Sequence, residues 1–181
     1  IALSGNGEPT ACKEFKSVLR IIEEEFTACK CPTDIKIRLI TNGSYLSEKE
    51  VQDAWQEMPL EKEIWFKIDS ANTLTIQQLN QVNLTQNQIR KNLESALSVS
   101  STVIQTCLTK INGQLPQESE ICEYVNLLKP YEKKINSIHL YSLARPTEQK
   151  TLYSLERLSD KEMIHIADKM DTLSIPIFTF S

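Results

Sequence analysis

Residues 35–70 read IKIRLITNGSYLSEKEVQDAWQEMPLEKEIWFKIDS, and this segment carries the most informative pattern in the sequence. It predicts one strand over 35–41 and another over 63–70, because both runs are rich in apolar and β-branched residues. Between them, Ser47 and Glu50 form a capping box that begins a helix. The apolar side of that helix carries Val51, Ala54, Trp55 and Met58. The stretch is therefore a strand–helix–strand unit, which favours parallel strands joined by a right-handed crossover.

The same alternation continues in both directions along the chain. Further strands are predicted over 1–3, 101–109, 135–143 and 174–180. Further helices are predicted over 10–29, 75–81, 86–99, 117–129 and 159–171, two of them with capping boxes at Thr85/Gln88 and Ser159/Glu162. The only long loop covers 144–158 and is a candidate insertion. Two α/β architectures fit this rhythm: an open doubly wound sheet, or part of a βα barrel.

Composition bounds the class of protein. The 181 residues are 40% hydrophobic and carry a net charge of -4, which is typical of one globular domain, 1–181, with no internal boundary. No apolar run is long enough for a transmembrane helix, and no signal peptide is visible, so we expect no membrane partner. The mild acidity disfavours RNA as a partner. Five cysteines, an odd number, indicate reduced thiols and a cytoplasmic location.

The beginning of the sequence indicates a fragment. The chain has no initiator Met, and residue 1 already lies inside a predicted strand. We therefore expect a longer protein whose leading segment is missing here.

Glycine is scarce, with four residues in 181, and all four follow predicted strands. Scarce glycines are expected where the backbone needs them. Ligand sites in both candidate architectures form at the carboxyl ends of the strands. The glycine-containing turns are therefore the first places to look for a site.

The first turn combines backbone freedom with a carboxylate. Gly5 and Gly7 flank Asn6 directly after a strand, so backbone groups can approach a ligand. Glu8 follows, and its negative charge suits a cationic group such as an amine better than a phosphate. A tight turn with Glu8 favoured beside a helix N-terminus explains the same residues equally well.

Two later strands end in polar side chains. Lys67 and Asp69 alternate along 63–70, so they share one side of a buried strand and need partners. They either form a buried ion pair or contact the hydroxyl or carboxylate groups of a ligand. Tyr141 and Arg145 share a face with His139 on the strand predicted over 135–143. Arg145 could bind a carboxylate or phosphate through two hydrogen bonds. His139 itself favours a core position, and His165 lies on an amphipathic helix in a structural or exposed position.

Other familiar chemistries are missing. Cys29-x-Cys31 has the wrong spacing for a zinc site, Cys12 lies within the predicted first helix, and no Cys-x-x-Cys occurs. Neither a P-loop nor a Ser-His-Asp arrangement can be assembled. No metal ligand and no catalytic residue is predicted within this chain.

Taken together, the turns resemble the radical S-adenosylmethionine (SAM) superfamily. Ser4-Gly5-Asn6-Gly7-Glu8-Pro9-Thr10 resembles its GGE motif, which follows the second barrel strand. Ile40-Thr41-Asn42-Gly43 resembles the end of the third strand, and Lys67-Ile68-Asp69-Ser70 the ribose motif of the fourth. Leu140 to Pro146 is similar to the sixth strand of some members. The order and spacing of these motifs cover most of the chain.

The resemblance implies a partial (β/α)6 barrel of parallel strands and an oxidoreductase-like activity. In this family a [4Fe-4S] cluster binds SAM through its amino and carboxylate groups, and reduction yields a 5′-deoxyadenosyl radical that abstracts hydrogen from a substrate. The implied cofactor-binding residues are Ser4, Gly5, Asn6, Gly7, Glu8, Asn42, Lys67, Asp69, Ser70, Tyr141 and Arg145. The implied partners are an electron donor such as flavodoxin or ferredoxin and an unknown substrate, a small molecule, peptide or protein rather than RNA.

Two departures limit what the resemblance implies. The cluster motif CxxxCxxC is absent, and in the family it lies upstream of the GGE motif, which here is before residue 1. The chain is thus expected to be an incomplete core, without the first strand and cluster loop, and inactive alone. The adenine motif GxIxGxxE of the fifth strand is not recognisable in 101–113.

Two other readings remain open. One is a non-catalytic α/β domain that binds a nucleotide or a protein and has no cluster. The other is an ordinary doubly wound nucleotide-binding enzyme. A CxxxCxxC upstream of Ile1 in the full-length gene would favour the radical SAM enzyme.

Overall fold

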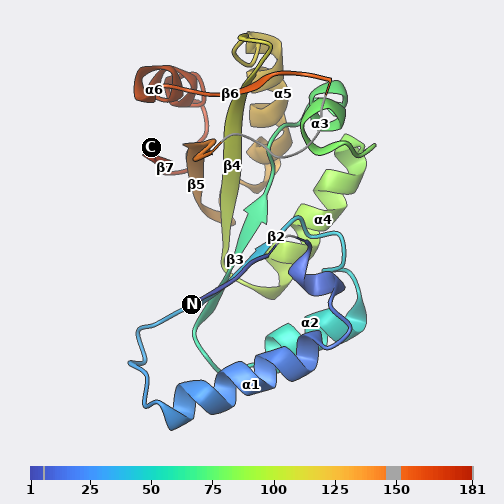
Figure 1. The fold of residues 1–181 in the computed structure, drawn as a ribbon, viewed down its shortest axis with the longest axis vertical. Helices are drawn as coiled ribbons and strands as arrows, with labels where there is room; N and C mark the ends of the chain where they lie inside the picture. The colour runs from blue at the N-terminus through green and yellow to red at the C-terminus, as the bar shows by residue number, and fades with distance from the viewer. Residues whose placement is uncertain (6, 146–151, 181) are drawn as a thin grey trace. The chain divides into compact units, whose positions relative to one another are not determined.

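The computed structural model describes residues 1–5, 7–145 and 152–180. Its strands form one sheet in the order β1-β2-β3-β4-β5-β7, with β6 paired to β4 (Figure 1). The chain divides into two compact units. Unit 1 comprises residues 1–67 and 91–103, and unit 2 comprises residues 68–90 and 104–181. That residues 1–181 form a single domain stays a prediction.

Unit 1 is a parallel three-stranded arrangement with helices. Its elements are β1 (Ala2–Leu3), the short 3-10 helix η1 (Pro9–Ala11), α1 (Phe15–Ala28), β2 (Ile37–Thr41), α2 (Lys49–Glu57) and β3 (Lys62–Lys67). The register places Ala2 opposite Arg38, and Thr41 opposite Phe66. The end of α4 (Gln86–Val99) and the first residues of β4 (Thr102–Ile111) also belong to this unit.

The core of unit 1 lies where the helices meet the strands. Its fully buried side chains include Ile37, Leu39, Trp55, Ile64, Phe66 and Leu93. Alternation explains the strand members, because successive side chains of β2 point to opposite faces. The opposite face of the same strands carries a polar cluster. There the buried carboxylate of Glu63 accepts hydrogen bonds from Arg38 Nε at 2.7 Å and Trp65 Nε1 at 2.9 Å.

Unit 2 contains the remaining strands and helices. Its elements are α3 (Thr73–Asn80), the start of α4, most of β4, α5 (Glu118–Leu128), the 3-10 helix η2 (Lys129–Tyr131), β5 (Ile135–Ser142), β6 (Leu155–Arg157), α6 (Asp160–Asp168) and β7 (Ile177–Phe180). β7 pairs parallel to β5, and β6 pairs antiparallel to β4. The side chains that form its core include Ile104, Leu108, Tyr124, Leu127, Ile138, Leu140 and Ile166.

The predicted fold class is confirmed. The sheet is α/β with parallel strands, β6 excepted, and it is not closed into a barrel, since β1 and β7 end the strand order. The capping boxes at Thr85/Gln88 and Ser159/Glu162 form as the sequence predicts.

Several predicted boundaries differ from the structure. The first helix begins at Phe15 and not Thr10, since Glu8 caps the separate turn η1; Cys12 therefore lies outside α1. Helix α2 begins at Lys49 after Glu48, so Ser47 and Glu50 do not cap it. Strand β3 ends at Lys67 rather than residue 70. The predicted loop over 144–158 includes β6, which pairs with β4.

Two of the four glycines adopt a backbone conformation that favours glycine. Gly43 and Gly113 have positive φ angles of +74° and +77°. Gly5 and Gly7 do not, and a Cβ atom at either would meet nothing within 4 Å. Neither the backbone conformation nor the packing of the protein requires glycine at these two positions. That they let a ligand approach the backbone stays a prediction.

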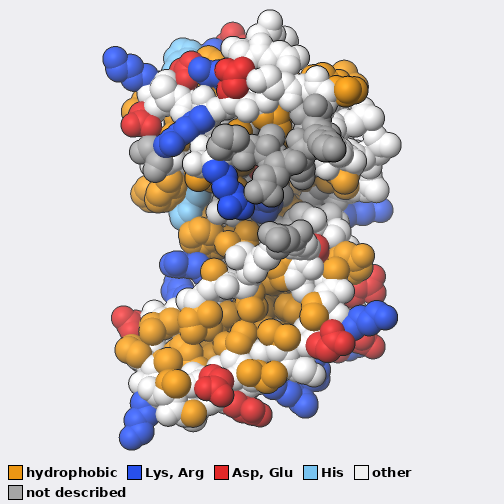
Figure 2. Space-filling model, in the orientation of Figure 1, with side chains coloured by type: hydrophobic (Ala, Val, Ile, Leu, Met, Phe, Trp, Pro, Cys, Tyr) orange, Lys and Arg blue, Asp and Glu red, His pale blue; other side chains and the backbone are white. Residues whose placement is uncertain are grey.

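Hydrophobic side chains gather on the surface of unit 1 around α1 (Figure 2). Ile1 and Ile21 are more than half exposed, at 53% and 57%.

None of the helices in the described ranges combines the length and apolar composition that crossing a bilayer requires.

The first turn of α6 supports a pH prediction. The Lys110 ammonium lies 2.8 Å from Glu162, and with hydrogen bonds from Ser159 it lowers the pKa of the Glu162 carboxyl to about 2. A carboxyl with a lowered folded-state pKa stabilises the fold fully above its unfolded pKa, and that contribution is lost as the pH falls towards 2. We expect Glu162→Gln to lower the free energy of unfolding at pH 7, and the difference from the wild type to shrink between pH 5 and pH 2. Urea unfolding at several pH values measures this; a pH-independent difference would contradict it.

Candidate functional site

In unit 1, the Glu8 carboxylate joins the turn after β1 to the turn after β2. Oε1 accepts hydrogen bonds from the Thr10 hydroxyl at 2.6 Å, the Thr10 backbone N–H at 3.2 Å and the Thr41 hydroxyl at 2.5 Å. Oε2 accepts from the Asn42 backbone N–H at 2.8 Å. The structural interpretation of Glu8 is confirmed, because its carboxylate caps a short helix. It also reaches the next strand end. Its contact with a cationic group of a ligand stays a prediction.

The two carboxylate oxygens of Glu8 differ in their remaining capacity to accept hydrogen bonds. A carboxylate oxygen has about two lone-pair sites, and Oε1 has three donors around it. Oε2 has one donor among the described residues, so one of its lone pairs can accept a further hydrogen bond. The side chain is half-buried, which leaves this oxygen within reach of a ligand.

The turn at Asn42 is fixed by its neighbours. The Gly43 N–H donates to Thr41 Oγ1 at 2.9 Å, and the Ser44 N–H donates to Asn42 Oδ1 at 2.9 Å. Asn42 itself is exposed. These bonds hold the Asn42 backbone N–H against Glu8 while its side chain stays at the surface.

The other predicted residues of unit 1 lie in exposed positions. Ser4, Gly5 and Gly7 are exposed, and Asn6 lies outside the described residues. Lys67, at the end of β3, is also exposed, so the expected buried position of this lysine is wrong. It needs no protein partner because water solvates its charge.

In unit 2, Asp69 and Ser70 follow β3 directly. The Cys107 backbone N–H donates to Asp69 Oδ1 at 3.1 Å, and Asn80 Nδ2 donates to Oδ2 at 3.1 Å. The buried Ser70 hydroxyl accepts from the Asn72 N–H at 3.0 Å. The Asp69 carboxylate is thus tied to β4 and to α3 and stays half-buried.

Tyr141 on β5 lies close to this carboxylate. Burial raises the pKa of the Tyr141 hydroxyl above its ordinary value, and the Asp69 charge and Cys107 act in the same direction. Asp69, Cys107 and Tyr141 therefore form one half-buried polar group. Sequence analysis did not single out Cys107, whose place depends on how β4 is aligned beside the end of β3.

The remaining candidates are on or after β5 and on α6. Arg145 is exposed, and Pro146, part of the motif Leu140 to Pro146, lies outside the described residues. His139 packs between Phe178 at 5.6 Å and Phe180 at 5.0 Å, measured between ring centroids. It is half-buried against two Phe side chains that are themselves about half exposed, so the predicted core position is not observed. His165 is exposed on α6.

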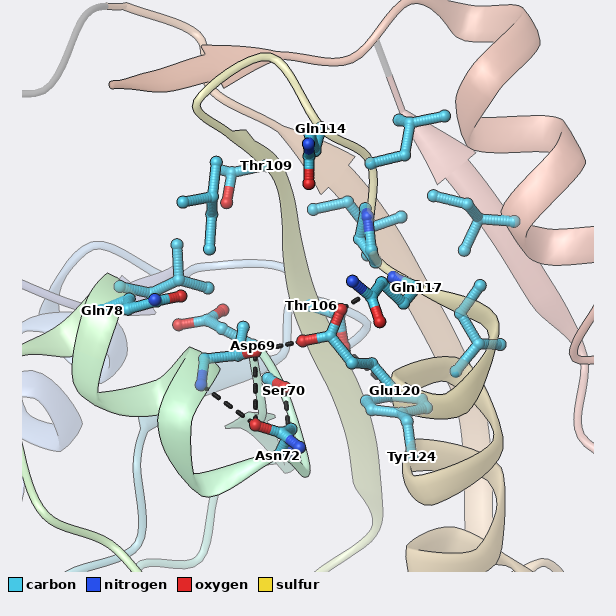
Figure 3. Close-up of a pocket in the computed structure, with 18 of the residues that line it drawn as sticks. Asp69, Ser70, Asn72, Gln78, Thr106, Thr109, Gln114, Gln117, Glu120 and Tyr124 are labelled. Atoms are coloured by element: carbon cyan, nitrogen blue, oxygen red, sulfur yellow. Dashed lines mark hydrogen bonds between the residues drawn. The ribbon is translucent and has the colours of Figure 1, made fainter. Parts of the chain in front are cut away.

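A cavity of about 450 Å³ lies within unit 2 (Figure 3). Its wall is built from the residues after β3, from α3, β4, the loop 112–117 and α5, with two residues from helix α6 and its end. Asp69 and Ser70 belong to this wall. Its position, beyond the ends of parallel strands, is where α/β sheets bind ligands.

No metal centre is assembled by the part of the chain that the structure describes. No three His, Cys, Asp or Glu side chains within it are grouped to hold a metal ion. All five cysteines are free thiols.

Comparison with solved structures defines the class of fold. A domain of pyruvate-formate lyase-activating enzyme from Bacteroides vulgatus ATCC 8482 is similar, with a TM-score of 0.64 and 15% identity over 100% of this chain and 98% of that one. A radical SAM methyltransferase from Sphaerobacter thermophilus has a TM-score of 0.63 and 15% identity over 99% of this chain and 50% of that one. Streptococcus suis SuiB, bound to precursor peptide SuiA, has a TM-score of 0.66 and 16% identity over 97% of this chain and 37% of that one.

These similarities are structural only. No family model and no curated protein matches the sequence. At 15–16% identity the similarity shows the fold and nothing finer, and the chain spans half of the methyltransferase and 37% of SuiB. The chain therefore has the open, parallel α/β fold of these radical SAM neighbours.

Proposed function

We propose that this protein is the core of a radical SAM enzyme and that its first two turns bind the amino group of SAM. The observation that carries the proposal is the arrangement of Glu8, whose Oε2 keeps an acceptor site beside the fixed turn at Asn42. A fixed carboxylate with a free lone pair suits an ammonium group. The similarity of fold to radical SAM enzymes supports the same proposal.

The residues of unit 2 support a second part of the proposal. Asp69 is a half-buried carboxylate that accepts hydrogen bonds, which suits the hydroxyl groups of a ribose. Ser70 fixes the backbone that follows by accepting from Asn72. Ser4, Gly5, Gly7, Lys67, Tyr141 and Arg145 remain proposed SAM-binding residues on the resemblance, and Asn6 is proposed on it too.

The described residues do not fit a [4Fe-4S] cluster, since no group of potential ligands is assembled there. The proposal therefore assigns the cluster's ligands to residues outside the described chain. In the proposed enzyme the reduced cluster would supply the electron that cleaves SAM. An electron donor such as flavodoxin or ferredoxin would then reduce the cluster again. No step of that reaction is assigned to a residue of this chain.

Glu8→Gln tests the proposed amino-group site. The change keeps the size of the side chain and removes its charge, so we expect the affinity for SAM to fall about tenfold, the loss of one charge-assisted hydrogen bond. Isothermal titration of SAM into the protein and into Glu8→Gln measures it, with Glu14→Gln as the control, because Glu14 is an exposed glutamate at the start of α1. Equal SAM affinity in wild type and Glu8→Gln would refute the assignment.

The second candidate is a non-catalytic α/β domain that binds a nucleotide or a protein, and it is equally compatible with described residues that form no metal-holding group. Anaerobic iron–sulfur reconstitution of the full-length protein distinguishes the two. The radical SAM proposal predicts 5′-deoxyadenosine when SAM and a reductant are added. The alternative predicts no cluster absorbance and no 5′-deoxyadenosine.

A further inference from the structure

The cavity of unit 2 has a lining of unusual charge. Among the described residues of its wall there are two carboxylates, Asp69 and Glu120, and no Lys, Arg or His. The other polar groups are hydroxyls and amides, from residues such as Thr75, Gln78 and Gln117. A wall of this kind offers no cation to a phosphate or a carboxylate, and its own negative charge repels them.

The two carboxylates are held in place. The Glu120 carboxylate accepts from the Gln117 N–H at 2.7 Å and from the Thr75 hydroxyl, which joins the start of α5 to α3. Asp69 is tied to β4 and to Asn80. The negative charge therefore stays at the cavity and does not swing away into solvent.

The smaller part of the wall is apolar. Leu79, Leu115, Ile121, Ile166 and Met170 contribute hydrocarbon surface, from four different segments of unit 2. A cavity of about 450 Å³ is large enough for an organic molecule with one or two rings. The mixture of fixed polar groups and hydrocarbon surface suits a small molecule that has both a polar group and a ring.

An unmet hydrogen bond lies in the same wall. Thr109 is 7% exposed, and its Oγ1 has no hydrogen-bond partner in the described chain. That oxygen has less than 1 Å² of accessible surface, so it reaches a ligand only after the side chain rotates to another staggered position. A buried hydroxyl without a partner is costly, so a ligand that supplies the partner gains affinity.

We propose that this cavity binds an uncharged or cationic ring compound that carries a hydroxyl or amine group, and that it excludes anions. The proposal rests on unit 2 alone. The cavity shares Asp69 and Ser70 with the proposed SAM site, so competition by SAM is one outcome that the titrations must distinguish. Figure 3 shows the groups concerned: Gln78 on α3, Thr109 on β4, and Glu120 at the start of α5.

Three indole compounds of similar size test the charge rule: tryptamine is cationic, tryptophol neutral and indole-3-acetate anionic. Titration of each into the protein, followed by NMR, should show that tryptamine and tryptophol bind and that indole-3-acetate binds at least about tenfold more weakly. The shifted resonances should belong to residues of the cavity wall. Failure of all three to bind, or equal binding of the anion, would overturn the proposal.

A charge inserted on α3 provides the matched variant. Gln78 lines the cavity, whereas Gln77 is the exposed neighbour on the same helix. Gln78→Lys should weaken tryptamine about fivefold and strengthen indole-3-acetate, because the new charge faces the ligand. Gln77→Lys adds the same charge to the same helix and should change neither. Identical effects of the two variants would show that the compounds bind elsewhere.

Two further variants keep the test decisive if Gln78→Lys folds poorly. Leu115→Trp should fill part of the cavity and abolish tryptophol binding. Thr109→Val should weaken tryptophol about threefold, while leaving the protein at least as stable, because an unpaired buried hydroxyl is removed. Unchanged tryptophol binding in Leu115→Trp would overturn the proposal. SAM titrations of the same proteins separate this result from the function proposed above, since SAM binding is tested there by Glu8→Gln.

Discussion

Replacing Gly43 with alanine should lower the free energy of unfolding by about 2–4 kcal/mol, from backbone strain and overpacking together. Gly43 has a φ of +74°, which an L-residue with a side chain adopts at a cost. A Cβ atom here would lie 2.4 Å from Phe66 Cε2 and 3.2 Å from Asn92 Cβ. Phe66 is only 1% exposed, so it cannot move aside into solvent.

Gly113→Ala is the matched control. Gly113 has nearly the same φ, +77°, but a Cβ atom there meets nothing within 4 Å. Its substitution should therefore cost only the backbone strain, about 1 kcal/mol. Urea unfolding of both variants measures the difference, and equal losses would show that Phe66 does not confine Gly43. The same turn places the Asn42 N–H against Glu8, so the proposed function predicts that Gly43→Ala also weakens SAM binding.

Thr106→Val should cost about 2–5 kcal/mol, because it leaves two buried polar groups without partners. The Thr106 hydroxyl has one proton, and it donates to the Ile68 carbonyl at 2.8 Å. The Tyr124 hydroxyl lies 2.6 Å from the same oxygen, so Tyr124 must be the donor of that second bond. Burial raises the pKa of Tyr124 well above its ordinary value, which keeps the phenol protonated and able to donate.

Tyr124→Phe separates the two bonds. It removes only the donation to Thr106 and leaves the bond to Ile68 intact, so we expect a smaller loss, about 1 kcal/mol. In the double variant the Tyr124 hydroxyl is absent, and Thr106→Val should cost less than it does in the wild type. Chemical denaturation of the three variants tests this order. A larger loss for Tyr124→Phe than for Thr106→Val would show that the direction of donation is wrong.

The helices and most strands followed from local patterns. Thr85 with Gln88, and Ser159 with Glu162, are close enough along the chain to meet as soon as a helix turn forms. The strand ends were less predictable. β3 ends at Lys67 and not at residue 70, because the Asp69 carboxylate occupies the Cys107 N–H that a longer strand would have bonded.

The candidate site also has features that follow from the local sequence and features that depend on strand pairing. The sequence indicated Glu8 as a carboxylate in a turn, which is a local property. Its bonds to Thr41 and Asn42 span more than 30 residues and arise only when β1 and β2 pair. Cys107 gave no signal of its own, because nothing in the chain near it records that the end of β3 lies beside it.

The amino-acid sequence by itself determined the α/β class, the order of its elements, and the turns that carry Glu8 and Asp69. These follow from periodicity and capping, which act between residues a few positions apart. The tertiary structure alone decided that Gly43 needs to be glycine because of Phe66, that Thr106 joins Tyr124 to Ile68, and that the walls of the unit 2 cavity carry carboxylates without a described cation. Each of these depends on strand register and helix packing between segments far apart in the chain, and local patterns do not encode such distances.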